Sequence, residues 1–211
     1  KKLFNTPRPL LSNDVFRSLE SLTCINDLET RVNELNARIE AGESFDTLME
    51  SLRKSVPYNV WYPETEFCYM RNDAGWFVAM KGGHNNESHN HNDIGTFTLY
   101  ADGVPMFVDA GVGTYTKQTF SKDRYTIWSM RSEWHNLPVI NGVYQHDGAE
   151  FRSSDVSVSF KKKSMRFSLD ISGAYDEEAD CNYWKRDYHL NGNAMTITDT
   201  YSLKERGAAD V

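Results

Sequence analysis

Histidine is concentrated in one short, polar stretch of the chain. Three of the six histidines, His84, His89 and His91, fall within residues 83–93, which are rich in asparagine. His89 and His91 are two residues apart, so on an extended backbone both side chains point to the same face. Two imidazoles placed in this way can share a metal ion, or one can bind metal while the other faces a substrate. Such a pair also occurs by chance, so it needs support from other residues.

Two later residues offer the further ligands that a metal site needs. Asp109 is followed by Ala110-Gly111 and therefore ends its strand-like run, and His135 stands at the start of another such run. A carboxylate commonly accompanies imidazole at metal sites, and three protein ligands with one open position are typical of zinc. The spacing leaves open whether His135 reaches the other groups and whether Asp109 is instead a loop cap.

Tyrosines and basic residues gather between these two ligand candidates. The group consists of Tyr115, Lys117, Lys122, Arg124 and Tyr125. A tyrosine near a cation can act as acid or base below its usual pKa of about 10. Arginine can bind a carboxylate or a sulfate through two parallel hydrogen bonds. The alternative is an ordinary solvated loop, which for any single one of these residues is the better interpretation.

A β-hairpin is predicted to bring Asp109 close to the histidines. Residues 96–101 and 104–108 are strand-like runs on either side of Asp102-Gly103, and an Asp-Gly pair in this position is a strong hairpin signal. With that turn, Thr96 is expected about opposite Asp109. Asp109 is then expected at the same end of the hairpin as the loop that holds the histidines.

The rest of the chain after about residue 59 also has the pattern of strands joined by short turns. The further predicted strands are residues 67–71, 76–80, 139–140, 156–160, 167–171, 183–190 and 194–203. Short turns between consecutive strands favour antiparallel pairing, and several such strands pack as a sandwich. We therefore predict a mainly β fold, an antiparallel multi-stranded β-sandwich preceded by short helices.

The N-terminal quarter has a helical pattern. Apolar residues recur every three or four positions from residue 15 to residue 39, which is the period of one helix face. Ser44 is placed to cap a second helix, in which Phe45 is expected to point inward. We predict a helical linker, or the end of a larger helical toroid, over residues 1–58 and one β-sandwich domain over residues 59–211.

The composition excludes some classes of function. The net charge is −7, so the general basic footprint of a nucleic-acid-binding protein is absent, although a locally basic cleft can still hold an anionic sugar. Cys24, Cys68 and Cys181 are too far apart for a disulfide framework or a zinc motif. No apolar run approaches the roughly 20 residues that span a bilayer. The start lacks the apolar core of a signal peptide and does not begin with Met, so we expect part of a longer protein.

Several separated motifs follow one another in order along the β-rich part. They are His89-Asn90-His91-Asn92-Asp93-Ile94-Gly95-Thr96-Phe97, Asp102-Gly103, Val108-Asp109-Ala110-Gly111, Thr114-Tyr115, Trp134-His135-Asn136 and Val139-Ile140-Asn141-Gly142. Upstream of them stand Trp61-Tyr62-Pro63-Glu64 and residues 76–83. Taken together, from about residue 61 to the C-terminus, the series resembles the signature of the heparinase II/III family of polysaccharide lyases.

The resemblance implies a fold, an activity and a set of site residues. Members of this family have an N-terminal helical toroid followed by antiparallel β-sheets. They cleave uronic-acid-containing polysaccharides, such as heparan sulfate or alginate, by β-elimination. The residues implied by the match are His91, Asp109 and His135 for binding Zn²⁺, His89 and Tyr115 for catalysis, and Asn92, Arg124 and Tyr125 for binding substrate.

The resemblance also implies that this chain is one part of a working enzyme. In the family, the main catalytic tyrosine and the groups that neutralise the uronate carboxylate come from the toroid. We therefore expect these 211 residues to be inactive alone. The implied partners are the toroid domain and an acidic polysaccharide, heparan sulfate-like or alginate-like, and the implied location is periplasmic or secreted.

Two other classes of function are compatible with the same residues. One is a non-catalytic, metal-stabilised carbohydrate-binding domain. The other is a hydrolase in which the metal activates water. An unsaturated product that absorbs ultraviolet light supports the lyase and excludes the hydrolase, whereas binding of sugar without turnover supports the binding domain.

Overall fold

The chain divides into two units, Lys1–Pro57 and Tyr58–Val211. The computed structural model describes residues 29–55, 57–161, 163–204 and 209–210. The part of the first predicted helix that precedes residue 29, together with Cys24, lies outside the described residues.

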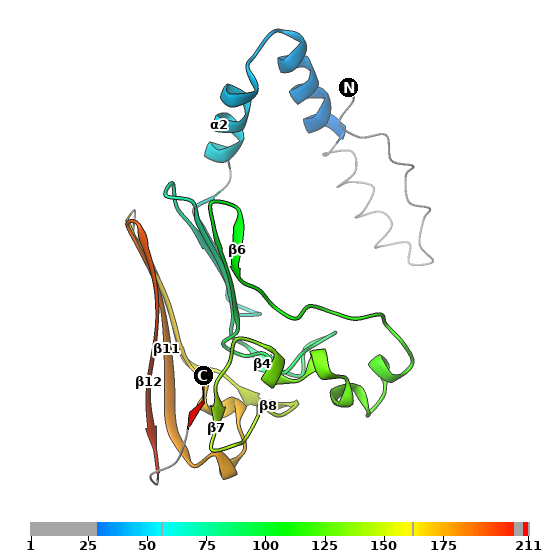
Figure 1. Cartoon of the computed structure of the whole chain (residues 1–211), viewed down its shortest axis with the longest axis vertical. Coiled ribbons are helices and arrows are strands. Elements are labelled where there is room, and N and C mark those ends of the chain that lie inside the picture. The colour runs from blue at the N-terminus through cyan, green and yellow to red at the C-terminus, as the bar shows by residue number, and fades with distance from the viewer. Residues whose placement is uncertain (1–28, 56, 162, 205–208, 211) are drawn as a thin grey trace. The chain divides into compact units, whose positions relative to one another are not determined.

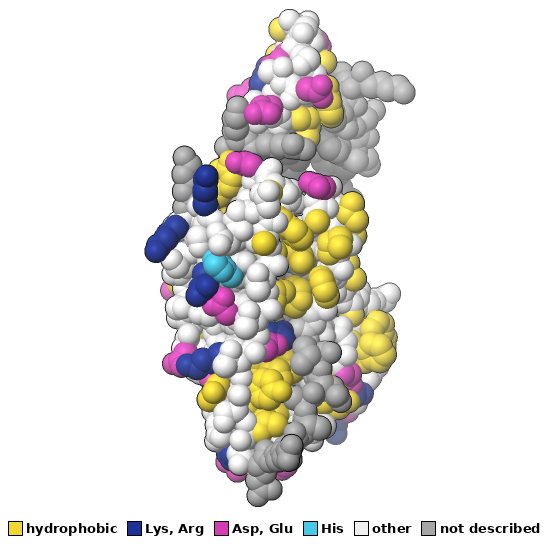
Figure 2. All heavy atoms as spheres, turned by 60° about the vertical axis from the view of Figure 1, so that its left-hand side comes forward, with side chains coloured by type: hydrophobic (Ala, Val, Ile, Leu, Met, Phe, Trp, Pro, Cys, Tyr) yellow, Lys and Arg dark blue, Asp and Glu magenta, His cyan; other side chains and the backbone are white. Residues whose placement is uncertain are grey.

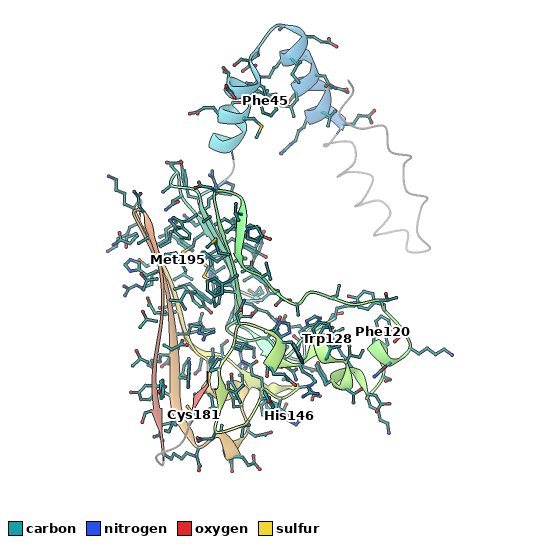
Figure 3. The ribbon with its side chains drawn as sticks, in the orientation of Figure 1. Phe45, Phe120, Trp128, His146, Cys181 and Met195 are labelled. Atoms are coloured by element: carbon teal, nitrogen blue, oxygen red, sulfur yellow. The ribbon has the colours of Figure 1, made fainter. Side chains whose placement is uncertain are left out.

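Two helical segments make up the described part of the first unit. Residues 29–40 are helical, and α2 spans Phe45–Ser55. Ser44 caps α2 as predicted, because its Oγ accepts a hydrogen bond from the Thr47 N–H at 3.2 Å. Phe45, labelled in Figure 3, is 71% exposed, so its predicted inward orientation is wrong. A side chain at the first position of a helix leans toward the N-terminus, where no preceding turn of that helix offers a surface to pack on.

A five-stranded antiparallel sheet forms one layer of the second unit. Its order is β1-β2-β3-β5-β6. The bounds are β1 Asn59–Tyr62, β2 Phe67–Arg71, β3 Trp76–Lys81, β5 Phe97–Ala101 and β6 Val104–Phe107. The predicted strands 67–71 and 76–80 pair as β2 and β3, and the predicted hairpin around Asp102-Gly103 is present as β5 and β6. β1 was not among the predicted strands, because four residues are too few to show a clear alternation.

The hairpin of β5 and β6 contains a bulge. Ala101 pairs with Val104 across the turn, as predicted, but the register then shifts so that Leu99 pairs with Phe107. The predicted pairing of Thr96 with Asp109, obtained by counting from the turn, is therefore displaced by one residue. Bulges of this kind are common beside functional sites, where they redirect a side chain.

A four-stranded antiparallel sheet forms the second layer. Its order is β12-β11-β10-β9, with bounds β9 Ser154–Lys161, β10 Ser164–Asp170, β11 Cys181–Asn191 and β12 Ala194–Leu203. Lys185, Asp187 and His189 of β11 alternate with buried residues and so lie on the outer face. Figure 2, in which the left side of Figure 1 has come forward, shows charged and histidine side chains scattered on this side and hydrophobic side chains gathered in a separate area.

The two layers pack face to face and enclose the core, as Figure 1 shows for β11 and β12 against the sheet that ends in β6. The ring of Trp61 lies 5.6 Å from that of Phe167, and the ring of Phe97 lies 5.8 Å from that of Tyr188. These contacts join the two sheets within one shared apolar cluster. The predicted mainly β, antiparallel sandwich is therefore confirmed.

Short elements complete the unit around one end of the sandwich. β4 (His84–Asn85) pairs with β8 (Gly148–Arg152), and β7 (Val139–Ile140) pairs with β13 (Ala209–Asp210). Between β6 and β7 the chain forms the 3-10 turns η1 (Gln118–Phe120), η2 (Arg124–Thr126), η3 (Trp128–Met130) and η4 (Ser132–Trp134), and two more follow β10, η5 (Ser172–Ala174) and η6 (Glu177–Ala179). Within the described residues, no helix has the length and hydropathy of a membrane span.

Candidate metal centre and histidine loop

Three side chains from separate segments meet at one end of the β-sandwich. His91 lies in the loop between β4 and β5 (residues 86–96, the histidine loop), Asp109 follows β6, and His135 follows η4. One potential ligand atom from each lies within 4.8 Å of the other two. Sequence spacing left open whether His135 reaches the other two groups, and the fold brings all three together.

The donor atoms of this group fit a metal ion. Nε2 of His91 and Nε2 of His135 are buried, and neither has a hydrogen-bond partner. Buried polar atoms almost always have a partner, so these two imidazole nitrogens are available as ligands for a metal ion. Two imidazoles and a carboxylate are a ligand set that zinc accepts. The three residues present fit a metal ion, for which Asp109 would exchange its hydrogen bond with His135 for a bond to the ion.

Asp109 fixes the orientation of His135. Its Oδ2 lies 2.6 Å from Nδ1 of His135, whose side chain is fully buried. An ionised carboxylate accepts a hydrogen bond from Nδ1–H, which leaves the lone pair of the imidazole on Nε2. The Oδ1 atom of Asp109 accepts a hydrogen bond from the Gly111 N–H at 2.7 Å. The carboxylate is thus held on both sides.

The electrostatic surroundings of His91 and Asp109 favour the protonation states that metal binding requires. Burial lowers the pKa of His91 below its usual 6.5, and the neighbouring His135 lowers it further against the opposing effect of Asp93. Burial acts most strongly and raises the pKa of Asp109, but the hydrogen bond and charge of His135, the Gly111 N–H and the charge of His91 together outweigh it, so the net pKa lies below the usual 3.8. A neutral imidazole and an ionised carboxylate are the forms that bind metal ions.

An exposed histidine and two aromatic rings lie beside this group. The backbone of His89 has a φ of 61°, in the left-handed region that is unusual for a residue with a side chain. Its ring contacts those of Tyr115 and Phe120, each at a centroid distance of 5.8 Å. Phe120, labelled in Figure 3, belongs to the segment that carries the 3-10 turns. The two residues predicted to be catalytic, His89 and Tyr115, are therefore neighbours, and Phe120 was not anticipated.

The three residues predicted to bind substrate have different surroundings. Asn92 is 3% exposed, and its Nδ2 donates a hydrogen bond to the Gln145 carbonyl at 3.3 Å. Arg124 donates to the Asn90 carbonyl through Nε at 2.9 Å and to the Thr119 carbonyl through Nη1 at 2.7 Å. Tyr125 is half-buried, with the Arg124 guanidinium 5.9 Å from its ring centroid. This arrangement favours a structural role for Asn92 and Arg124.

Gln145 is a structural residue that the sequence reasoning missed. Its side chain holds both backbone groups of Ile94: Oε1 accepts from the N–H at 3.0 Å, and Nε2 donates to the carbonyl at 2.7 Å. Its own N–H donates to Ser132 Oγ at 2.9 Å, three residues before His135. Gln145 thus links the segments that carry His91 and His135. A lone glutamine in a polar turn gives no signal of this role in the sequence.

A cavity of about 310 Å³ opens beside the candidate ligands. The residues that line it come from β2, β3, the histidine loop and the segment after β6, and include Lys81, Glu87, His89, His91, Asp109 and Gly111. A smaller hollow of about 170 Å³ shares Phe67, Lys81, Asp93 and Asp109 with this cavity and extends along the five-stranded sheet past Tyr69. The metal group therefore lies at the wall of an open, polar pocket.

Comparison with solved structures places the same fold in larger enzymes. The chain is similar to a mutant of the heparan sulfate lyase HepC from Pedobacter heparinus, with 12% identity, a TM-score of 0.58, and coverage of 84% of this chain and 28% of that one. It is also similar to a structure of heparinase III, with 18% identity, a TM-score of 0.55, and coverage of 72% and 23%. A third structure, the heparinase III-BT4657 gene product, has 14% identity, a TM-score of 0.55, and coverage of 86% and 28%.

The chain spans less than a third of the length of these proteins. At such identities the likeness concerns the fold. No curated protein sequence matches the chain. A family model described as heparinase II/III-like, C-terminal, matches residues 56–211, which is most of the chain. The chain therefore belongs to the heparinase II/III-like family and represents its C-terminal domain.

Proposed function

We propose that this chain is the C-terminal domain of a polysaccharide lyase that cleaves uronic-acid-containing polysaccharide by β-elimination. The observation that carries the proposal is the placement of exposed His89 against Tyr115, beside the buried group of His91, Asp109 and His135. An acid or base on an open surface, next to a rigid anchor, is what proton abstraction from a polymer requires. The family and the lyases with the same fold agree with this choice.

The reaction needs two proton transfers at one sugar ring. A base takes the proton on the carbon next to the uronate carboxylate, the electron pair forms a carbon–carbon double bond, and the bond to the 4-linked oxygen breaks. An acid then protonates the leaving oxygen. We assign one of these transfers to His89, whose ring is accessible, and place Tyr115 within reach of the same sugar. Tyr125 is our main candidate for sugar contact. Asn92 and Arg124 are proposed to contribute less to substrate binding.

We propose zinc as the metal held by His91, Asp109 and His135. Two imidazoles and a carboxylate form a common zinc ligand set. When bound, zinc supplies a cross-link between the histidine loop and the segment that carries His135. That cross-link orients His89, which is two residues from His91, toward the pocket. Its role in this proposal is structural, because nothing in the elimination needs an activated water.

The substrate class and the location follow from the same family. The carboxylate of the substrate must be neutralised before the proton is removed, since a dianionic intermediate is costly. We propose that a helical toroid supplies the neutralising groups and the main catalytic tyrosine, and that this chain alone is inactive. A heparan sulfate-like or alginate-like polymer lies outside cells, so we propose a periplasmic or secreted location.

The experiment measures zinc and lyase activity in parallel. Purified chain is analysed for zinc beside the His91→Ala and His135→Ala variants, and about one zinc per chain is expected only in the wild type. A longer protein that contains this domain is then incubated with heparan sulfate or alginate, and absorbance of the unsaturated product is followed. His89→Ala is expected to lower turnover by about 10²–10⁴-fold.

His189→Ala is the matched control, because His189 lies on β11 with Ser164 and Arg166 as its partners. It is expected to keep both zinc and activity. Sugar binding without an unsaturated product, in the longer protein as well, contradicts the lyase and supports a carbohydrate-binding domain. Chain cleavage without ultraviolet absorbance supports a hydrolase instead.

A further inference from the structure

A buried lysine lies directly beneath the histidine loop. Lys81 is the last residue of β3, and its side chain is only 6% exposed. Its Nζ donates to Oδ1 of Asn90 at 3.0 Å and to Oδ1 of Asp93. Oε2 of Glu87 lies 3.8 Å away. A buried ammonium group is costly unless it is paired in this way.

The partners of Lys81 stand on both sides of His91. Asn90 immediately precedes His91, and Asp93 follows two residues later. Arg124 holds the carbonyl of the same Asn90 from another segment. Asn90 is thus held through both its side chain and its backbone carbonyl, directly before the candidate ligand His91. Lys81 also lines the cavity that contains His89, His91 and Asp109.

Direct contact of Lys81 with an anionic substrate fits the geometry poorly. An ammonium group has three N–H donors, and here three acceptors from the histidine loop surround it. Because so little of the side chain is exposed, a substrate carboxylate or sulfate has to displace one of these partners. A pure packing role fits poorly as well, since apolar residues of similar size fill a buried site at least as well as an ion pair.

We propose that Lys81 is a positioning residue for the metal centre, one that sets His91 through Asn90 and Asp93. The inference rests on the proposed metal site. Residues that hold a metal ligand in place without binding the metal themselves typically contribute 10–100-fold to metal affinity. Lys81 acts on the loop from the adjoining strand, so the rigid sheet fixes the loop in place.

The test compares zinc affinity in the wild type and in Lys81→Met, which matches the unbranched aliphatic part of the lysine side chain and removes the charge. Affinity is measured by competition with a coloured chelator at neutral pH, with folding checked by circular dichroism. We expect zinc to bind about 10–100-fold more weakly in the variant. Cobalt(II) in place of zinc gives visible bands that report ligand geometry, and these are expected to change in Lys81→Met.

Leu190→Ala separates positioning from general loss of stability. Leu190 is 1% exposed and pairs with Met195 close to the turn between β11 and β12, far along the sandwich from Lys81. Its truncation leaves a cavity and destabilises the fold, yet zinc affinity and cobalt spectrum are expected to stay those of the wild type. Equal loss of affinity in both variants overturns the inference, because the effect is then global. Unchanged affinity in Lys81→Met overturns it while leaving the metal site intact, whereas absence of zinc binding in the wild type overturns both.

Discussion

The surroundings of His91 and His135 favour metal binding already in the metal-free chain. Burial keeps His91 neutral, and the carboxylate of Asp109 sets the tautomer of His135. In both rings Nε2 is left without a partner in the protein interior. The cost of these unsatisfied atoms falls on the metal-free state, so metal binding is expected to stabilise the fold.

The pH dependence of the metal-free protein provides a test at this scale. In the folded chain the pKa of His91 lies below 6.5 because burial disfavours the charged ring. The unfolded chain therefore binds this proton more strongly, and the free energy of unfolding falls as the pH drops from about 6.5 through the lowered folded pKa. Above 6.5 the contribution is present in full. Urea unfolding in the presence of a chelator at pH 7.5 and pH 5 measures the difference.

His91→Gln is the matched variant, since glutamine is similar in size and does not titrate in this range. It is expected to reduce the loss of stability on acidification. The same loss in both proteins assigns the effect to other groups and contradicts the role of burial at His91.

At the scale of elements, the histidine loop is a polar segment held by its neighbours. Gln145 binds both backbone groups of Ile94, and Lys81 binds the side chains of Asn90 and Asp93. The loop then enters β5 through Gly95, which has a φ of 84°. A Cβ added there meets Cγ2 of the fully buried Ile171 at 2.8 Å. The close approach of loop and sheet at this point depends on glycine.

Gly95→Ala is expected to lower the free energy of unfolding by about 2–4 kcal/mol, from left-handed backbone strain together with overpacking against Ile171. Gly103→Ala is the control, because Gly103 has a similar φ of 76° with nothing within 4 Å of the added Cβ. The control is expected to lose only the backbone part, about 1–2 kcal/mol. Thermal or urea unfolding of the two variants distinguishes them, and equal losses contradict the proposed contact.

At the scale of the whole β unit, Arg186 connects the four-stranded sheet to the metal centre. It is 2% exposed and forms two hydrogen bonds with its cross-strand neighbour Asp199, at 2.7 and 2.6 Å. Its Nη1 also donates to the carbonyls of Gly95 and Asn136, at 3.0 and 2.7 Å. These carbonyls belong to the end of the histidine loop and to the residue after His135. One guanidinium thus joins both ligand-bearing segments to the core.

Arg186→Met is expected to cost about 3–5 kcal/mol, because it leaves the Asp199 carboxylate and two carbonyls without their donor. The double variant Arg186→Met with Asp199→Leu is expected to recover part of this loss, since no unpaired charge remains. Urea unfolding measures both. A double variant that is less stable than the single one contradicts the interpretation of Asp199 as the unpaired group.

The sequence by itself determined the elements and the residue types of the site. The hairpin around Asp102-Gly103, the alternating strands and the cap at Ser44 are local signals, and each is present as predicted. The motifs around His91, Asp109 and His135 also indicated the family, because their order along the chain can be compared with that of other sequences without a structure.

Only the tertiary structure decided which of these residues meet and what holds them. The approach of His135 to Asp109, the bulge at Leu99, and the roles of Gln145 and Lys81 depend on segments that are distant in sequence. Local patterns report how a residue relates to its own strand or turn, whereas a buried hydrogen bond between segments is fixed only when the sheets have packed. For that reason a lysine at the end of an apolar strand and a glutamine in a polar turn gave no signal until the fold was known.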